Sequence, residues 1–333
     1  MENNAIQKKL DLQKLLAPAA LVILYVAFSI IAKDAFFSLT MVQNILESSY
    51  YIGFMAFGVT FIIITGGIDL SLGTVMMCSA LLGAYTFKQL QWPLIAAVFV
   101  TVGVGTVFGF LNGNLVARLK LPPFISTLGT MMMSQGIGPI LTKTQSQTWP
   151  IATDPVGGWF KQVFIRANIF GIDRFPVGAL WLAGFFVIAA LILHKTKFGR
   201  YTFAIGSNEE AARLSGINVD AWKVGVYTLS GFFVGIAGLM YAAAYTTITP
   251  GTGNGQEMNG ITGVVIGGTS MSGGSGSMAG TLIGVFIMSV LKNGLSACGL
   301  QAPWQTFFTG LVVIGAVLLD IQRTKAANRV KKS

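Results

Sequence analysis

The sequence predicts an all-α polytopic membrane protein with about ten transmembrane helices, some short or broken, and with both termini in the cytoplasm. Hydrophobic residues make up 53% of the 333-residue chain and charged residues only 10%, whereas soluble domains carry about 25% charged residues. Apolar runs of roughly the length that crosses a bilayer recur along the chain. Glycine is abundant, at 41 residues, which is typical of transmembrane helices that pack closely or break.

The chain begins with a basic amphipathic leader, residues 1–14, and then becomes apolar. A cleaved signal peptide would have a shorter apolar core and a small-residue cleavage site, so we expect an uncleaved first helix. The transmembrane domain is expected at residues 15–321, followed by a basic cytoplasmic tail at 322–333. Its candidate spans are residues 15–33, 43–65, 69–88, 92–117, 122–142, 175–194, 222–246, 257–271, 276–296 and 303–321, of which 257–271 is short enough to be broken or re-entrant.

The distribution of basic residues predicts the orientation. The net charge is +10, but Lys and Arg lie mainly between the apolar runs, which positive-inside topology explains better than a nucleic-acid-binding face. With the N-terminus inside, most of them fall in inner segments. Residues 195–221 are then a cytoplasmic loop and residues 143–174 a large external loop. We expect Trp149, Trp159 and Trp181 near the outer membrane interface.

The sequence contains no recognisable catalytic centre. His194 is the only histidine, Cys78 and Cys298 lie far apart in apolar runs, and no GxxxxGK[ST] phosphate loop is present. We therefore predict no catalytic residue, no metal site and no cofactor bound by this chain. If ATP drives the protein, another chain must bind it. Ion coupling is weakly supported, because few charges come near the spans: Glu47, Asp69, Glu257 and Lys292.

Two glycine-rich segments join apolar runs. In GGIDLSLG, residues 66–73, the glycines let the backbone turn, and Asp69 can cap the next helix. Alternatively, Asp69 and Ser71 contribute to a substrate path or gate. The segment GGTSMSGGSG, residues 267–276, resembles the first and contains Thr269 and Ser270. It is either a flexible hairpin or an inner gate or partner contact, and the likeness is either an internal repeat or chance.

A third segment opens a helix with two prolines. In PPFISTLGT, residues 122–130, proline is tolerated because the first helical turn does not need its N–H. The hydroxyls of Ser126, Thr127 and Thr130 either face a watery path or bond back to their own helix.

The polar segment KTKFGRYTFAIGSNEEAARLSGINV, residues 195–219, interrupts two apolar runs. A short helix is expected within residues 207–216, because Ser207 or Asn208 can cap it and acidic residues favour its N-terminal end. It is either an ordinary cytoplasmic loop helix or a docking element whose partly apolar surface fits a groove on a soluble partner. The docking hypothesis comprises Ser207, Asn208, Glu209, Glu210, Ala211, Ala212, Arg213, Leu214 and Gly216.

At these residues the chain resembles the permease subunits of bacterial ABC importers for monosaccharides of the ribose, galactose and arabinose type. The resemblance covers nearly the whole chain and includes GGIDLSLG, PPFISTLGT, the polar segment, LSGFFVGIAGLM (229–240) and GGTSMSGGSGS (267–277). The chain departs from the family at Asn259, Gly260, Thr262 and Gly263, where small apolar residues are usual. This departure puts the regularity of the helix in question.

The resemblance implies a permease in the bacterial inner membrane that imports a sugar and is not itself an enzyme. It implies two ATP-binding cassette ATPase subunits, which bind ATP and Mg²⁺, an extracytoplasmic sugar-binding protein and a second permease copy. Residues 207–216 would be the coupling helix that enters the ATPase cleft. Two alternatives are an ABC permease for another solute, such as a branched-chain amino acid, nucleoside or signal sugar, and a secondary transporter.

Overall fold

A computed structural model describes residues 2–169 and 172–330, with side chains described at 17–33, 35–169, 174–318 and 320–322. The basic side chains of the leader and of most of the tail lie outside these ranges. The helices are α1 (Glu2–Ala32), α2 (Leu39–Ile64), α3 (Leu72–Lys88), α4 (Leu94–Ala117), α5 (Pro123–Thr142), α6 (Trp159–Phe164), α7 (Val177–Lys195), α8 (Lys197–Ser207), α9 (Glu209–Leu214), α10 (Val219–Tyr245), α11 (Gln256–Ile266), α12 (Met278–Ala297) and α13 (Ala302–Val330), with a 3₁₀ turn at Lys33–Ala35.

Each apolar range predicted from the sequence overlaps a helix. In the described part of the chain, six helices are long and apolar enough to cross a membrane: α2, α4, α7, α10, α12 and the stretch Ala302–Gln322 of α13. Helix α11 has 11 residues, about 16 Å at 1.5 Å per residue, so it is too short to span a hydrocarbon core of about 30 Å. The expectation of a short span there is confirmed, whereas the total number of crossings stays a prediction.

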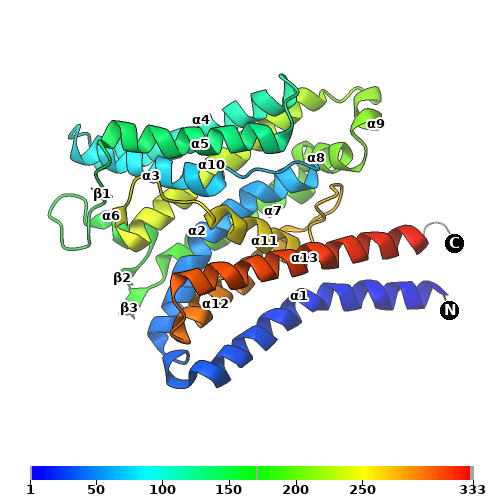
Figure 1. Cartoon of the computed structure of the whole chain (residues 1–333), viewed down its shortest axis with the longest axis horizontal. Coiled ribbons are helices and arrows are strands. Elements are labelled where there is room, and N and C mark those ends of the chain that lie inside the picture. The colour runs from blue at the N-terminus through cyan, green and yellow to red at the C-terminus, as the bar shows by residue number, and fades with distance from the viewer. Residues whose placement is uncertain (1, 170–171, 331–333) are drawn as a thin grey trace.

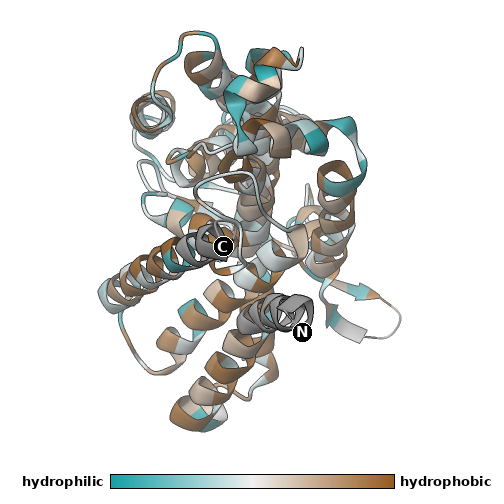
Figure 2. Cartoon of the chain, turned by 90° about the vertical axis from the view of Figure 1, so that its right-hand side faces the viewer, coloured by the Kyte–Doolittle hydropathy of each residue, from teal (hydrophilic) through white to brown (hydrophobic). Residues whose placement is uncertain are grey.

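The bundle has two distinct ends (Figure 1). At one end, here called the strand end, lie α6 and two small antiparallel ribbons that the all-α prediction did not include. The opposite end, here called the α9 end, carries α8, α9, the start of α1 and the end of α13. Figure 2 shows hydrophilic residues on the short segments at the α9 end and hydrophobic residues along the long helices. The ribbons pair β1 (Gln147–Thr148) with β4 (Thr247–Ile248), and β2 (Ala167–Ile169) with β3 (Ile172–Phe175).

Helix α2 forms the centre of the bundle and is almost completely buried. Ser38 begins it as an N-cap, because its hydroxyl accepts a hydrogen bond from Met41 N at 3.1 Å. Helices α7, α10, α11 and α12 pack around it, and Phe54 and Phe57 meet Phe233 of α10 in the core. The apolar run Tyr50–Ile64 of α2 is buried on all sides, as expected of a helix segment that is hydrophobic around its whole circumference.

Glycines allow α4 and α10 to pack with their backbones in contact. A Cβ added to Gly105 would lie 2.6 Å from Gly231 O, and one added to Gly109 would lie 2.8 Å from Gly231 Cα. Gly235 meets Val102 of α4 at a similar separation. Since apolar side chains gain little from association in lipid, close backbone packing through small residues is a main source of helix association there.

Close backbone packing also occurs at α11, where the chain departs from the family. Gly263 packs against the backbone of Gly284, and Gly267 against Gly280, so α11 lies close to α12. Helix α11 is regular from Gln256 to Ile266. The polar and glycine residues of this segment therefore do not break the helix.

The segment between α5 and α7 is anchored to the bundle. Arg166 pairs with Glu47 of α2 and donates to Gln43 Oε1 at 3.1 Å. Trp149 is buried, stacks on Phe160 and donates to Ala80 O at 3.0 Å, so its indole contacts protein, while its depth near the outer interface stays a prediction. Its indole N–H is satisfied by protein, because the loop folds back over α3. Trp159 and Trp181 remain partly exposed.

Candidate functional site

Helix α9 is a short, capped helix on the surface of the α9 end. Asn208 Oδ1 accepts from Ala211 N at 2.9 Å, so Asn208 is the N-cap, while Ser207 is the last residue of α8. The helix ends at Leu214. Gly216 follows with a φ of +82°, and Ile217 N donates to Ala212 O at 3.2 Å. A left-handed glycine beyond the last turn is a common helix stop, since it carries no Cβ.

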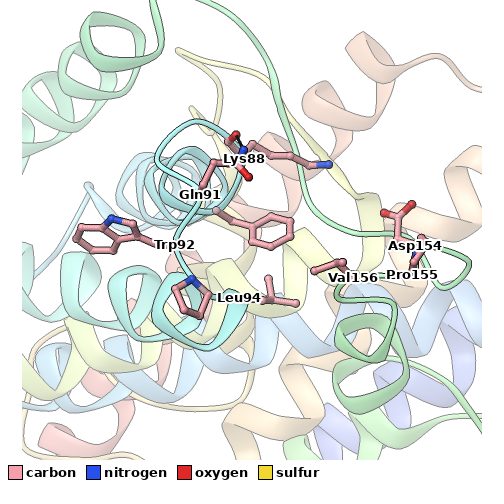
Figure 3. Close-up of a pocket in the computed structure, with 9 residues that line it drawn as sticks. Lys88, Gln91, Trp92, Leu94, Asp154, Pro155 and Val156 are labelled. Carbon is pink, nitrogen blue, oxygen red and sulfur yellow. Dashed lines mark hydrogen bonds between the residues drawn. The ribbon is translucent and has the colours of Figure 1, made fainter.

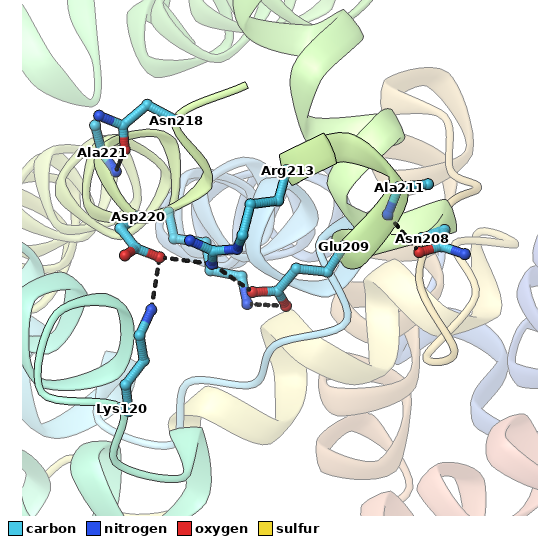
Figure 4. Close-up of polar contacts among 9 residues, drawn as sticks. Lys120, Asn208, Glu209, Ala211, Arg213, Asn218, Asp220 and Ala221 are labelled. Atoms are coloured by element: carbon cyan, nitrogen blue, oxygen red, sulfur yellow. Dashed lines mark hydrogen bonds and ion pairs between the residues drawn. The ribbon is translucent and has the colours of Figure 1, made fainter. Parts of the chain in front are cut away.

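Ion pairs hold α9 against its neighbours (Figure 4). Glu209 Oε2 lies 2.6 Å from Lys223 Nζ of α10, and Arg213 lies 2.9 Å from Asp220 Oδ1. Lys120, from the turn after α4, reaches the same oxygen of Asp220 at 2.6 Å. Burial raises the pKa of Glu209, but the hydrogen bond and charge of Lys223 and the charges of Arg213 and Lys120 outweigh it and lower the pKa. Glu209 is therefore ionised at neutral pH.

The two sides of α9 differ. Ala212 is buried against Ile205 and Val219, so it does not belong to the exposed docking surface that the sequence suggested. Leu214 is 84% exposed, and Glu210 and Ala211 are also exposed. An exposed leucine next to an alanine and a carboxylate on a fixed helix forms a small apolar knob with a charged rim.

The second glycine-rich segment fits between α8 and the end of α2. Gly274 N donates to Ile64 O at 2.8 Å, and the same carbonyl packs against Gly206 so closely that a Cβ there would overlap it. Gly273, with a φ of +81°, lies near both Gly206 O and Gly66 N. The two glycine-rich segments that resemble each other in sequence are therefore in contact next to α9.

Asp320 fixes the other side of this segment. Its Oδ2 accepts from Met271 N at 3.1 Å and from Ser270 Oγ at 3.4 Å. Thr269 is fully buried, and its hydroxyl has no hydrogen-bond partner among the described residues. The sequence analysis missed Asp320. Its signal is an acidic residue near the end of the last apolar run, as for the other charged residues near the spans.

A buried polar network surrounds Asp69. Its Oδ1 accepts from Ser71 N at 2.8 Å and Ser71 Oγ at 2.6 Å. Asn112 of α4 donates to Ser71 Oγ at 3.0 Å and accepts from Thr130 Oγ1 of α5 at 2.7 Å. The predicted helix cap is wrong, because Ser71 is the N-cap of α3 and makes no side-chain cap. Asp69 instead closes the turn that precedes the helix.

The structure separates the other predicted hydroxyls. Thr130 joins the Asp69 network, but Ser126 and Thr127 bond back to Pro122 O and Pro123 O at 3.2 and 2.9 Å. Thr269 and Ser270 belong to the glycine-rich contact at the α9 end. Asn112 was missed, although it is an amide within an apolar run, two residues before Asn114, and such an amide is a signal for a buried polar contact inside a membrane domain.

The long apolar helices, the buried polar network and the exposed α9 define a multi-pass integral membrane protein with a surface helix at one end. A family model described as the permease component of branched-chain amino acid transport systems matches residues 41–317. The chain belongs to this family. It is 39% identical to the ribose import permease of Bacillus subtilis, over 94% of each chain.

Two further relatives extend this similarity to other sugars. The fructose import permease of Rhizobium meliloti is 34% identical over 90% of this chain and 83% of its own. The galactose/methyl galactoside import permease of Escherichia coli is 32% identical over 95% of this chain and 97% of its own. The chain is accordingly a transport component rather than an enzyme, and the predicted resemblance to permeases of sugar importers is confirmed.

Proposed function

We propose that this chain is the transmembrane permease of an ABC importer that moves a monosaccharide across the bacterial cytoplasmic membrane. The observation that carries the proposal is its similarity, along nearly its whole length, to import permeases for ribose, fructose and galactose. ATP hydrolysis would occur in separate ATPase subunits, which would hold ATP and Mg²⁺. Nucleotide would drive transport by binding one conformation of the assembly better than the other.

Helix α9 is our candidate for the ATPase contact. It is short, capped and fixed to α10 by ion pairs, so force applied to it would reach the bundle. Leu214 and Ala211 would enter a groove on the ATPase, in the way that a short helix presents apolar anchors to a partner. Ser207, Asn208 and Glu210 would contribute its polar rim, whereas Glu209 and Arg213 mainly hold the helix in place.

The α9 end would face the cytoplasm, so the start of α1 and the end of α13 would also be cytoplasmic. This orientation agrees with an even number of crossings, about ten, and with the concentration of basic residues near α9. The strand end would then face outward and receive a sugar-binding protein. It carries an open cavity of about 510 Å³ between the end of α3 and the loop before α6, with Lys88 and Asp154 in its lining (Figure 3).

A second copy of the chain would complete the pore. The network of Asp69, Ser71, Asn112 and Thr130 would be part of the sugar path or its gate, because buried polar side chains in a membrane domain are costly unless they serve a purpose. The contact of the 267–276 segment with Gly66 would connect this network to α9.

The test is sugar uptake by vesicles that contain this permease with its ATPase and binding protein. We expect ATP-dependent uptake of one of D-ribose, D-galactose or D-fructose. Leu214→Asp and Ala211→Asp should abolish uptake, because a charge would be buried in the ATPase groove, while the amount of folded permease stays unchanged. Asn218→Asp is the control, because Asn218 is exposed outside residues 207–216 and an aspartate there keeps the cap that accepts from Ala221 N at 3.1 Å.

Two outcomes would contradict the proposal. Uptake that persists without ATP but collapses with an uncoupler would indicate a secondary transporter. Normal uptake in Leu214→Asp and Ala211→Asp would exclude α9 as the coupling helix. Glu209→Lys is a poorer test, because it would also break the pairs with Lys223 and Arg213.

A further inference from the structure

A small polar cavity lies where the chain passes from α10 to α11. Its volume is about 150 Å³, enough for several water molecules at about 30 Å³ each in the liquid. Most of its lining is polar, although the surrounding helices are apolar. The lining residues are Met77, Tyr241, Thr247, Thr249, Thr252, Gly253 and Gln256.

The backbone beside this cavity enters the helical bundle without being helical. After β4, residues 249–255 run inward until Gly253 packs against Gly73, with a Cβ at Gly253 only 2.6 Å from Gly73 O. Gly73 is the second residue of α3 and lies about 22 Å along this helix from Lys88 at the strand end. Non-helical backbone at membrane depth is tolerated only where protein buries it or where it lines a water-filled cavity.

The lining groups match the chemistry of a monosaccharide. A sugar ring has hydroxyls around its edge and C–H groups on its faces, so it needs hydrogen-bonding groups beside an apolar or aromatic surface. Thr249, Thr252 and Gln256 supply hydroxyl and amide groups, and Tyr241 supplies a ring. Asn259 Nδ2 donates to Gln256 Oε1 at 3.3 Å, which orients the amide. Few, fixed polar groups in a pocket are what give orientation and specificity.

The ring of Tyr241 is held in place by neighbours that sequence reasoning did not connect. It packs edge-on against the Tyr51 ring, with the ring centroids 5.2 Å apart. It lies tilted against the Tyr245 ring, with the centroids 4.5 Å apart. Lys292 Nζ donates to Tyr51 OH at 2.6 Å and lies 5.9 Å from the centre of the Tyr245 ring. The ammonium of Lys292 is thereby stabilised inside the bundle by a hydroxyl and aromatic faces.

Polar side chains continue from this cavity toward Asp69. A very small adjoining cavity shares Met77, Thr249 and Thr252 and reaches Thr74 and Ser134. Ser134 Oγ donates to Thr74 Oγ1 at 2.8 Å, and Thr74 Oγ1 donates to Ser71 O at 3.0 Å. The cavity is thus one end of a row of hydroxyls that leads to the Asp69 network.

We propose that this cavity is a sugar-binding site within the permease, with Tyr241 against a C–H face of a monosaccharide and Thr249, Thr252 and Gln256 on its hydroxyls. The inference rests on the proposed function in sugar import. It adds a site at which the permease itself holds the sugar between the binding protein and the inner half of the path.

The experiment uses the complete importer in vesicles and whichever of D-ribose, D-galactose or D-fructose the wild type takes up. Gln256→Ala and Thr252→Val should each lower the maximal uptake rate about tenfold, as expected for the loss of one or two hydrogen bonds. Tyr241→Leu should do the same, whereas Tyr241→Phe should transport nearly normally because it keeps the ring. ATPase activity stimulated by the loaded binding protein should persist in all of them.

Thr228→Val is the matched control, because Thr228 lies on α10 with Tyr241 but is not among the residues that line the cavity. Thr249→Trp is a second route to the answer, since Thr249 is exposed to the cavity and a larger side chain would fill it. If Gln256→Ala, Thr252→Val or Tyr241→Leu fails to fold, Thr249→Trp decides. Blocked uptake by a well-expressed Thr249→Trp permease supports the site, and normal uptake by it overturns the site. Normal uptake in Gln256→Ala and Thr252→Val also overturns it. A wild type without ATP-dependent sugar uptake would instead overturn the proposed function.

Discussion

Asn112 joins three helices through one amide. Its Nδ2 donates to Ser71 Oγ at the start of α3, and its Oδ1 accepts from Thr130 of α5. It is buried with Ser71 and Thr130, so removing the amide would leave both hydroxyls without this partner. Ser71 Oγ would keep its bond to Asp69, and Thr130 Oγ1 could bond to backbone carbonyls of its own helix. The change therefore removes two hydrogen bonds and leaves neither hydroxyl unsatisfied.

We therefore predict that Asn112→Leu lowers the free energy of unfolding by about 1–3 kcal/mol in total, from the loss of two hydrogen bonds that each contribute about 0.5–1.5 kcal/mol. This loss of stability would appear as a lower melting temperature of the detergent-purified Asn112→Leu permease. Asn114→Leu is the control, because Asn114 is on the same helix but its Nδ2 bonds only to Phe110 O of its own backbone. Equal shifts for the two variants would show that the network contributes nothing specific.

For single residues, the sequence suggested that Asp69, Ser71 and Thr130 belong to a polar path, but it could not associate them with Asn112. The residues come from three helices, and their register against one another is set by packing. The sequence also predicted Asp69 as a helix cap. The structure places its carboxylate on Ser71 instead, because α3 begins at Leu72 and Asp69 lies two residues before the N-cap Ser71.

The pairing of α4 and α10 depends on glycine at regular spacing. Gly105, Gly109 and Gly113 lie four residues apart, so they form one face of α4. Each meets the backbone of α10 at less than 3 Å from where a Cβ would stand. Any side chain on this face would push the helices apart and remove the van der Waals contacts that hold them together.

Overpacking a core usually costs about 1–3 kcal/mol. Gly109→Leu should cost several times as much, because the obstacle is backbone and not a movable side chain. Little folded permease should remain in the membrane fraction. Gly103→Leu is the matched control, since no described residue lies within 4 Å of a Cβ at Gly103 on the same helix. Comparable amounts of folded protein for both variants would refute the backbone-contact argument.

Across the whole molecule, Gly206 is the point where α8, the 267–276 segment and the end of α2 meet. Ile64 O accepts from Gly274 N and packs directly on Gly206. Asn208 is the single residue that links α9 to α8. Movement of α9 would therefore pass to α8 and Gly206, and from there to the turn that holds Asp69. A close junction of backbone is stiff, so it can transmit a displacement that flexible side chains would absorb.

We predict that Gly206→Ala separates ATP hydrolysis from transport. The added methyl would overlap Ile64 O and force Ile64 away from the α8–α9 junction. Because this backbone clash also costs stability, uptake is compared per folded permease; it should fall about tenfold or more while the ATPase still associates and hydrolyses ATP. The measurement is uptake and ATPase activity on the same vesicles. Gly184→Ala should leave both unchanged, because none of the residues that the structure describes lies within 4 Å of the added Cβ.

The sequence by itself determined the class of protein, the positions of the apolar helices, the short helix near residue 210 and the family. Each follows from local composition, capping and motif, which need no knowledge of neighbours. Only the tertiary structure decided that Ala212 faces inward, that Trp149 is buried and that the two glycine-rich segments touch. It also brought Tyr241, Thr252 and Gln256 to one cavity. These features depend on how helices far apart in the chain pack. The register between such helices is set by close glycine contacts, and composition alone does not predict which glycines meet.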